Sequence, residues 1–193
     1  SPIDPELNRN KEADEALNNA GVRTVMNLSD NEAKMKSYDG YPNSYYSQRD
    51  IIPLNLAMDF FSDEFSAGLA KGMEFFASHE GPYLVHCMEG KDRTGYVCAL
   101  LEGLCGATYE EIVADYLVTY DNYYGITPTT DADVCNALVS LRLNTCLMFY
   151  AGIDDESQLP HVDFATAFAD YLLTHGMTRP ELDALIRALT YYQ

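Results

Sequence analysis

The sequence predicts an α/β fold: a small, mostly parallel central sheet flanked by helices, with additional helices in the C-terminal half. Two observations predict it. Short β-rich or apolar runs at 22–28, 51–54 and 83–85 alternate with helical patterns in the first half of the chain. Beyond about residue 107 the patterns are helical throughout. We therefore expect residues 1–193 to form one domain, with the helical half packed onto the sheet.

The first elements follow from local signals. Residues 10–20 have a helical pattern that ends at Gly21, and 22–28 are β-rich and suit a central strand. The run at 51–54 is expected near a sheet edge, because Pro53 lacks an N–H group. Between these strands, residues 30–48 are polar and rich in turn formers. Their tyrosines either border a substrate mouth or serve ordinary packing: Tyr38, Tyr41, Tyr45 and Tyr46.

The later elements are mostly helices. A helix is expected from Ser62 to about His79, with acidic residues in its first turn, and a buried helix follows the strand at 83–85. Thr108 and Glu111 form a capping box that starts the next helix. Further helical patterns cover 131–149, 162–175 and 180–189, the last preceded by a second capping box, Thr178 to Glu181.

Nine residues between the strand at 83–85 and the following helix carry the chemistry: His86, Cys87, Met88, Glu89, Gly90, Lys91, Asp92, Arg93 and Thr94. A tight loop between a strand and a helix directs backbone N–H groups at one point, where the helix adds partial positive charge. The same field favours the thiolate of Cys87, a nucleophile. We therefore expect residues 88–94 to bind a phosphate group that Cys87 attacks.

Individual residues of this loop have distinct expected roles. Arg93 offers a planar fork to two phosphate oxygens, and Thr94 donates its hydroxyl to the sulfur. Gly90 relieves crowding where the backbone turns its amides inward, and Gly95 allows close packing just inside the helix.

The motif resembles the His-Cys-x5-Arg-Ser/Thr signature of the cysteine-based protein tyrosine phosphatase superfamily. Its loop is most similar to that of bacterial tyrosine and phosphoinositide phosphatases, which reads Cys-x-x-Gly-Lys-Asp-Arg-Thr-Gly. The β-rich run from Gly21 to Leu28 also resembles a core strand of that superfamily, although Ser29 replaces its usual Arg. The resemblance implies hydrolysis of phosphomonoesters through a cysteinyl-phosphate, without a cofactor. It also implies that His86 hydrogen-bonds backbone behind the loop and tunes Cys87.

The proton donor for the leaving group has two candidates. Asp59 lies 28 residues before Cys87 at a strand-to-helix junction, roughly where many superfamily members carry a mobile acidic loop. That loop often contains a Trp-Pro pair, and this chain has no Trp. Asp92 matches the residue to which the role of general acid has been assigned in the bacterial relatives. It could instead keep the loop amides or Arg93 in position. The choice stays open, with a slight preference for Asp92.

The cysteines and histidines suggest no metal site. The five cysteines lack metal-ligand spacing. Cys98 and Cys105 are expected to pack in the core, and the alternative is a resolving-cysteine role for one of them. No His pair or acidic cluster has ligand spacing either, so no metal is predicted.

Charge and composition constrain the partners. With 12 Lys and Arg against 30 Asp and Glu, the formal net charge of -18 opposes binding to nucleic acid or anionic membranes. A phosphate or sulfate ion could still occupy the loop, and no integral membrane segment is expected. A reduced Cys87 favours the cytoplasm, but export remains open because the sequence begins at Ser1 rather than Met.

The sequence thus predicts a phosphatase of the protein tyrosine phosphatase type. The resemblance makes phosphotyrosine on protein the first substrate to expect. Dual-specificity or phosphoinositide activity is compatible with Lys91 as an extra loop cation. Glu89 argues against very highly phosphorylated substrates. The alternative is a catalytically impaired phosphate-binding pseudophosphatase. Sulfur-transfer or arsenate-reducing enzymes also use a loop cysteine, but their loop length or cysteine position differs.

Overall fold

The computed structural model describes residues 1–190, and it contains a three-stranded parallel sheet. The strands are β1 (Thr24–Asn27), β2 (Asp50–Pro53) and β3 (Tyr83–His86), in the order β2-β1-β3. Met26 lies opposite Ile52 on one neighbour and Val85 on the other. All four residues of β1 are buried, as a central strand requires. The predicted small parallel sheet is confirmed, with the 51–54 run at an edge.

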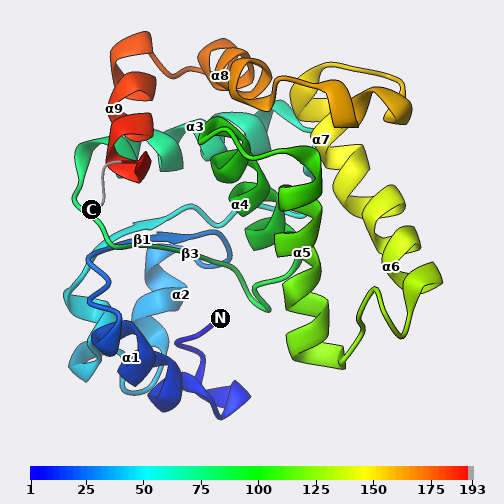
Figure 1. The fold of residues 1–193 in the computed structure, drawn as a ribbon. Helices are drawn as coiled ribbons and strands as arrows, with labels where there is room; N and C mark the ends of the chain where they lie inside the picture. The colour runs from blue at the N-terminus through cyan, green and yellow to red at the C-terminus, as the bar shows by residue number, and fades with distance from the viewer. Residues whose placement is uncertain (191–193) are drawn as a thin grey trace.

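Helices cover both faces of the sheet (Figure 1). They are α1 (Asn10–Asn19), α2 (Glu32–Ser37), α3 (Asp63–Ser78), α4 (Asp92–Leu104), α5 (Tyr109–Tyr124), α6 (Ala132–Leu138), α7 (Thr145–Ala151), α8 (Phe164–Thr174) and α9 (Arg179–Thr190). Short 3-10 turns occupy Pro5–Leu7, Tyr41–Asn43, Tyr46–Gln48 and Glu156–His161. The helices predicted from sequence are present, and the Thr108–Glu111 capping box forms as expected.

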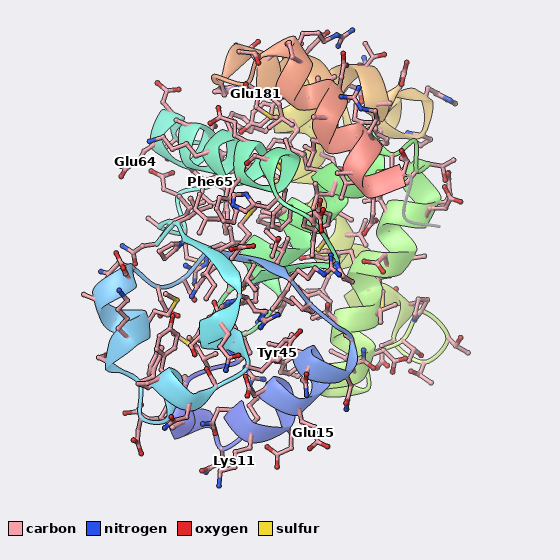
Figure 2. All side chains as sticks on the ribbon, turned by 90° about the vertical axis from the view of Figure 1, so that its left-hand side faces the viewer. Lys11, Glu15, Tyr45, Glu64, Phe65 and Glu181 are labelled. Carbon is pink, nitrogen blue, oxygen red and sulfur yellow. The ribbon has the colours of Figure 1, made fainter. Side chains whose placement is uncertain are left out.

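The two faces of β1 bury different cores because successive side chains point to opposite sides of a strand. Val25 packs with Met35 and Tyr46 on the face that α1 and α2 cover, whereas Met26 joins the larger core beneath α3 and α4. Figure 2 shows the matching pattern on α3, where Glu64 points outward and the buried Phe65 points inward.

The C-terminal helices share this larger core. In Figure 1, α9 lies beside α3 and α8 covers the end of α4, and buried residues of all four belong to one cluster. Gly103 of α4 makes the second contact possible, since a Cβ there would lie 2.4 Å from Cε2 of Phe168. We propose, as the sequence predicts, that residues 1–193 form a single domain, because the helical half completes the core of the sheet half.

The stretch predicted as one helix over 131–149 is helical throughout, with a π-helical segment in its middle. Between α6 and α7, residues Val139–Asn144 form a π-helical segment, called η4 here, so the whole helix runs over Ala132–Ala151. This is the one helix within residues 1–190 whose length and composition would allow it to cross a membrane. Its apolar window has a mean hydropathy of 1.3 and is 39% buried. A core helix of a soluble protein passes the same test, so this is weak support for a membrane segment.

One smaller expectation needs correction. Cys105 is exposed at the end of α4, so its predicted place in the core is wrong, while Cys98 is only partly exposed. The polar stretch between β1 and β2 contains α2, and its Tyr46 is completely buried in the smaller core. For Tyr46, packing is therefore the correct one of the two alternatives.

Candidate active site

The loop that joins β3 to α4 is tight because one glycine allows an unusual backbone turn. The strand ends at His86 and α4 begins at Asp92, so only five residues connect them. Gly90 has a φ of +78°, a left-handed conformation that residues with a Cβ rarely adopt. With this turn, the Gly90 N–H donates to Cys87 Sγ at 3.3 Å. The loop thus directs backbone amides toward the sulfur.

Cys87 lies almost fully buried at the start of this loop, with 4% of its surface exposed. Burial alone would raise the pKa of the thiol. Interactions with the Thr94 hydroxyl and amide, with the Gly90 amide and with the positive Arg93 outweigh burial, so the pKa of Cys87 lies below its ordinary value. Thr94 Oγ1 is buried and has no partner at normal hydrogen-bond geometry within residues 1–190. Apart from its interaction with the sulfur, the hydroxyl therefore remains available to a bound anion.

Arg93 is held in place by backbone from two other elements. Its Nη1 donates to the carbonyl oxygen of Leu28 at 3.1 Å and to that of Leu56 at 2.8 Å. These carbonyls follow the ends of β1 and β2, so the parallel sheet itself fixes the guanidinium. Nε of Arg93 is buried and lacks a hydrogen-bond partner in the part of the chain that the structure describes. A buried donor without a partner is costly, and an anion at the loop would satisfy it.

His86 belongs to a buried polar network behind the loop. Its Nδ1 lies 3.3 Å from the Cys87 carbonyl oxygen, and its Nε2 lies 2.7 Å from the hydroxyl of Tyr46. The amide of Asn27 donates to both Tyr46 and Asp30, and the Asp30 side chain is fully buried. This chain of contacts ties the base of the loop to the end of β1.

Burial also fixes the charge of His86. It lowers the pKa of the imidazole from 6.5 to about 4, so the ring is neutral at ordinary pH. The two ring nitrogens contact the Tyr46 hydroxyl and the Cys87 backbone. The predicted contact of His86 with backbone is present, and its predicted influence on Cys87 stays a prediction.

The two candidate acids lie in different surroundings. Asp92 begins α4, and its Oδ1 lies 2.8 Å from Nη1 of Arg142 in η4, with 17% of the carboxylate side chain exposed. Asp59 is exposed, and its carbonyl oxygen accepts hydrogen bonds from Ser62 at the start of α3. Its neighbour Phe60 packs edge-on against Tyr96 of α4 at 4.6 Å. Asp92 therefore lies in the first turn of α4, and Asp59 belongs to a segment that contacts α4 through Phe60.

The ammonium group of Lys91, a residue of the loop, already has partners. Its Nζ lies 3.0 Å from a Glu89 carboxylate oxygen, 4.0 Å from one of Asp92 and 3.4 Å from the hydroxyl of Tyr124. The hydrogen bond with Glu89 is the largest cause of a raised pKa for Lys91. Lys91 is thus a permanent cation, shared between two carboxylates.

The outward face of the loop has partners that sequence reasoning did not identify. Tyr123 donates to the Glu89 carbonyl oxygen at 2.7 Å, and Arg9 donates to that of Met88 at 3.1 Å. Arg142 was missed as well. These residues are separated from their loop contacts by 34, 79 and 50 positions. No local pattern in the sequence signals such contacts.

Two further features complete the site. Gly95 lies where a Cβ would come 2.9 Å from the Tyr116 ring, which shows how closely α4 and α5 approach. A pocket of about 230 Å³ opens beside the loop, between α1 and the end of β3, and includes Arg9, Cys87 and Tyr123 in its lining.

Residues 1–190 contain no group of three or more His, Cys, Asp or Glu side chains arranged to hold a metal ion.

A parallel sheet that presents a cysteine of lowered pKa and an arginine with a buried Nε at the N-terminus of a helix defines a hydrolase of the tyrosine phosphatase type. A sequence model of the tyrosine phosphatase family matches residues 6–191, and the chain belongs to this family. It is also 51% identical over 41 residues to the triple specificity protein phosphatase PtpB of Mycobacterium tuberculosis. That match covers 21% of this chain and 15% of PtpB, so most of the relative lies outside it.

Proposed function

We propose that the protein hydrolyses phosphomonoesters through a cysteinyl-phosphate on Cys87, with phosphotyrosine on protein as its first substrate. One observation carries the proposal. The loop combines a sulfur whose pKa is lowered with a buried Arg93 Nε that has no partner among residues 1–190. A phosphate group supplies what both lack, an electrophile for the thiolate and an acceptor for the guanidinium.

The reaction has two steps. In the first, the Cys87 thiolate attacks phosphorus, the bond to the leaving oxygen breaks, and a carboxylic acid gives that oxygen a proton. In the second, water attacks phosphorus, the S–P bond breaks, and the carboxylate accepts the proton of the water. Amides of residues 88–94 and the fork of Arg93 stabilise the charge on the transferred group during both steps. This chemistry needs no metal or cofactor.

We assign the acid to Asp92, with Asp59 as the alternative. Asp92 precedes Arg93 directly, lies in the first turn of α4, and is oriented by its ion pair with Arg142. Asp59 has an exposed side chain on a segment that precedes α3, so it would have to be positioned by substrate. The ion pair of Asp92 is the reason for the preference, since a fixed carboxylate loses little freedom on reaching its target.

Turnover of an aryl phosphate tests the nucleophile, and turnover of an alkyl phosphate tests the general acid. Replacing the nucleophile in Cys87→Ser should lower kcat by about 10⁴-fold or more. Loss of a general acid typically costs about 10²–10⁴-fold. Asp92→Asn should show such a loss with an alkyl phosphate, and Asp59→Asn should not; the reverse result would make Asp59 the acid. Binding of phosphate by the wild-type protein without any turnover would instead establish the pseudophosphatase.

The substrate range is proposed to be broad among monophosphates. Lys91 could meet a second anionic group, as in a phosphoinositide, but Glu89 and Asp92 already share its charge. This arrangement disfavours very highly phosphorylated substrates. The name of PtpB, a triple specificity phosphatase, supports testing more than one class. Rates on phosphotyrosine peptides, phosphoserine peptides and phosphoinositides would rank them, and a preference for inositol polyphosphates would contradict the proposal.

A further inference from the structure

In the catalytic loop, residues 87–94, the Gly90 amide donates to Cys87 Sγ, while the carbonyl oxygens of Met88 and Glu89, called the outer carbonyls, accept from Arg9 and Tyr123. In a trans peptide the C=O and N–H groups point in opposite directions. A contact that fixes a carbonyl outward therefore directs the N–H of the next residue inward. The outer carbonyls of Met88 and Glu89 are thus a means of controlling the amides of Glu89 and Gly90.

Tyr123 holds one of these carbonyls. Its hydroxyl donates to the Glu89 oxygen at 2.7 Å, from the last turn of α5. The N–H in the same peptide group belongs to Gly90 and donates to Cys87 Sγ at 3.3 Å. One peptide plane therefore connects the Tyr123 hydroxyl to the sulfur, although the two side chains lie on different elements.

Arg9 holds the neighbouring carbonyl and Tyr123 itself. Its Nη2 donates to the Met88 oxygen at 3.1 Å, its Nη1 donates to the Tyr123 hydroxyl, and its Cζ lies 5.9 Å from the centre of the Tyr123 ring. The amino group of Ser1 also donates to the Met88 oxygen, so Arg9 is not its sole donor. Arg9 thus acts on the loop in two ways, directly and through Tyr123.

We propose that Tyr123, supported by Arg9, is a positioning residue that clamps the outer carbonyls of the catalytic loop and so aims the Gly90 and Glu89 amides at the sulfur and the bound phosphate. The proposal rests on the phosphatase function of the same loop. Neither side chain is required to touch the reacting atoms. Both act through the peptide planes between Met88 and Gly90.

The test measures the sulfur directly, without turnover. The rate of alkylation of Cys87 by iodoacetamide is followed against pH, with the modified peptide quantified by mass spectrometry so that the other cysteines do not interfere. In Tyr123→Phe the Gly90 amide is no longer fixed, so the midpoint of the profile should move to higher pH. Below the midpoint the rate should fall about three- to tenfold, the effect of one hydrogen bond. Arg9→Gln should change the profile in the same direction.

Tyr109→Phe is the matched control. Tyr109 lies at the start of the same helix, whereas Tyr123 lies in its last turn. The Tyr109 hydroxyl donates to Asn144 at 3.0 Å and not to the catalytic loop. Its alkylation profile should match the wild type. A second measurement, protection of Cys87 by inorganic phosphate, should require about three- to tenfold more phosphate in Tyr123→Phe. Circular dichroism and urea unfolding establish that each variant is folded.

The outcomes separate this proposal from the proposed function. If Tyr123→Phe and Tyr109→Phe both keep the wild-type profile and protection, the positioning role is overturned, even if the wild type hydrolyses phosphate esters. If Tyr123→Phe alone shifts while the wild type shows no turnover, the clamp stands and the hydrolase function fails. A shift in Tyr123→Phe without one in Arg9→Gln would overturn the supporting role of Arg9.

Discussion

His86 should make the stability of the protein depend on pH in a defined window. Burial lowers the pKa of its imidazole to about 4, against 6.5 for an exposed ring. As pH falls through 6.5, the unfolded chain takes up a proton at this residue, but the folded protein does so only near pH 4. The stabilising contribution is therefore complete above about pH 6.5 and is lost progressively between 6.5 and 4.

The magnitude follows from the difference between the two states. The difference in the pKa of His86 between these states lowers the free energy of unfolding by about 3 kcal/mol when the whole window is crossed. Between pH 7 and pH 5 the decrease is about 2 kcal/mol. Urea unfolding followed by circular dichroism gives the free energy of unfolding at both pH values. His86→Gln removes the titrating ring while retaining a hydrogen-bonding side chain for Tyr46. Its loss of stability between pH 7 and pH 5 should be smaller than that of the wild type by about 2 kcal/mol.

His161→Gln provides the control, because it removes an exposed imidazole of the same type. Titrating carboxylates contribute to the pH dependence of all three proteins, and the comparison cancels their share. Parallel stability profiles for the wild type and His86→Gln between pH 7 and pH 5 would refute the reasoning, since the buried imidazole would then not be the source of the dependence.

Three other results are expected. Arg142→Gln should lower kcat for alkyl phosphates about tenfold with little change in KM, because Asp92 loses its orienting partner; steady-state kinetics measure this, and recovery in Arg142→Lys would support it. Gly103→Ala should destabilise the fold by about 1–3 kcal/mol in urea unfolding, since its Cβ would clash with buried Phe168; an unchanged midpoint would contradict the packing. Aryl phosphate turnover should persist after dialysis against EDTA, and its loss would show that a metal takes part.

Features with a local signature were predictable from the sequence. The β-rich run at 22–28 is the central strand because its residues are buried on both faces, and the Thr108–Glu111 capping box starts α5 through contacts within one turn. The position of Pro53 on an edge strand follows from its missing N–H. In each case the physical cause lies within a few residues, so it can be recognised in one dimension.

Contacts made by the tertiary fold were not predictable in the same way. Arg142 reaches Asp92 across 50 positions, and the tyrosine that meets His86 is 40 positions away. In the sequence, Tyr46 is one of several tyrosines in a polar stretch, and nothing distinguishes it from the others. In the folded protein it is completely buried. The π-helical turn that carries Arg142 also lacks a local signal, because its residues fit an ordinary helix pattern.

The distribution of charge shows why the composition alone is a poor guide to the ligand. The chain has 30 acidic and 12 basic residues, yet four of the 12 contact or belong to the catalytic loop: Arg9, Lys91, Arg93 and Arg142. Only Glu89 and Asp92 offset them within the loop. Since exposed charges more than about 10 Å apart are largely screened by salt, an anion at the loop experiences mainly these close groups and the amides. A strongly acidic protein can therefore hold a phosphate, provided that the binding groups are gathered by the fold and not spread over the surface.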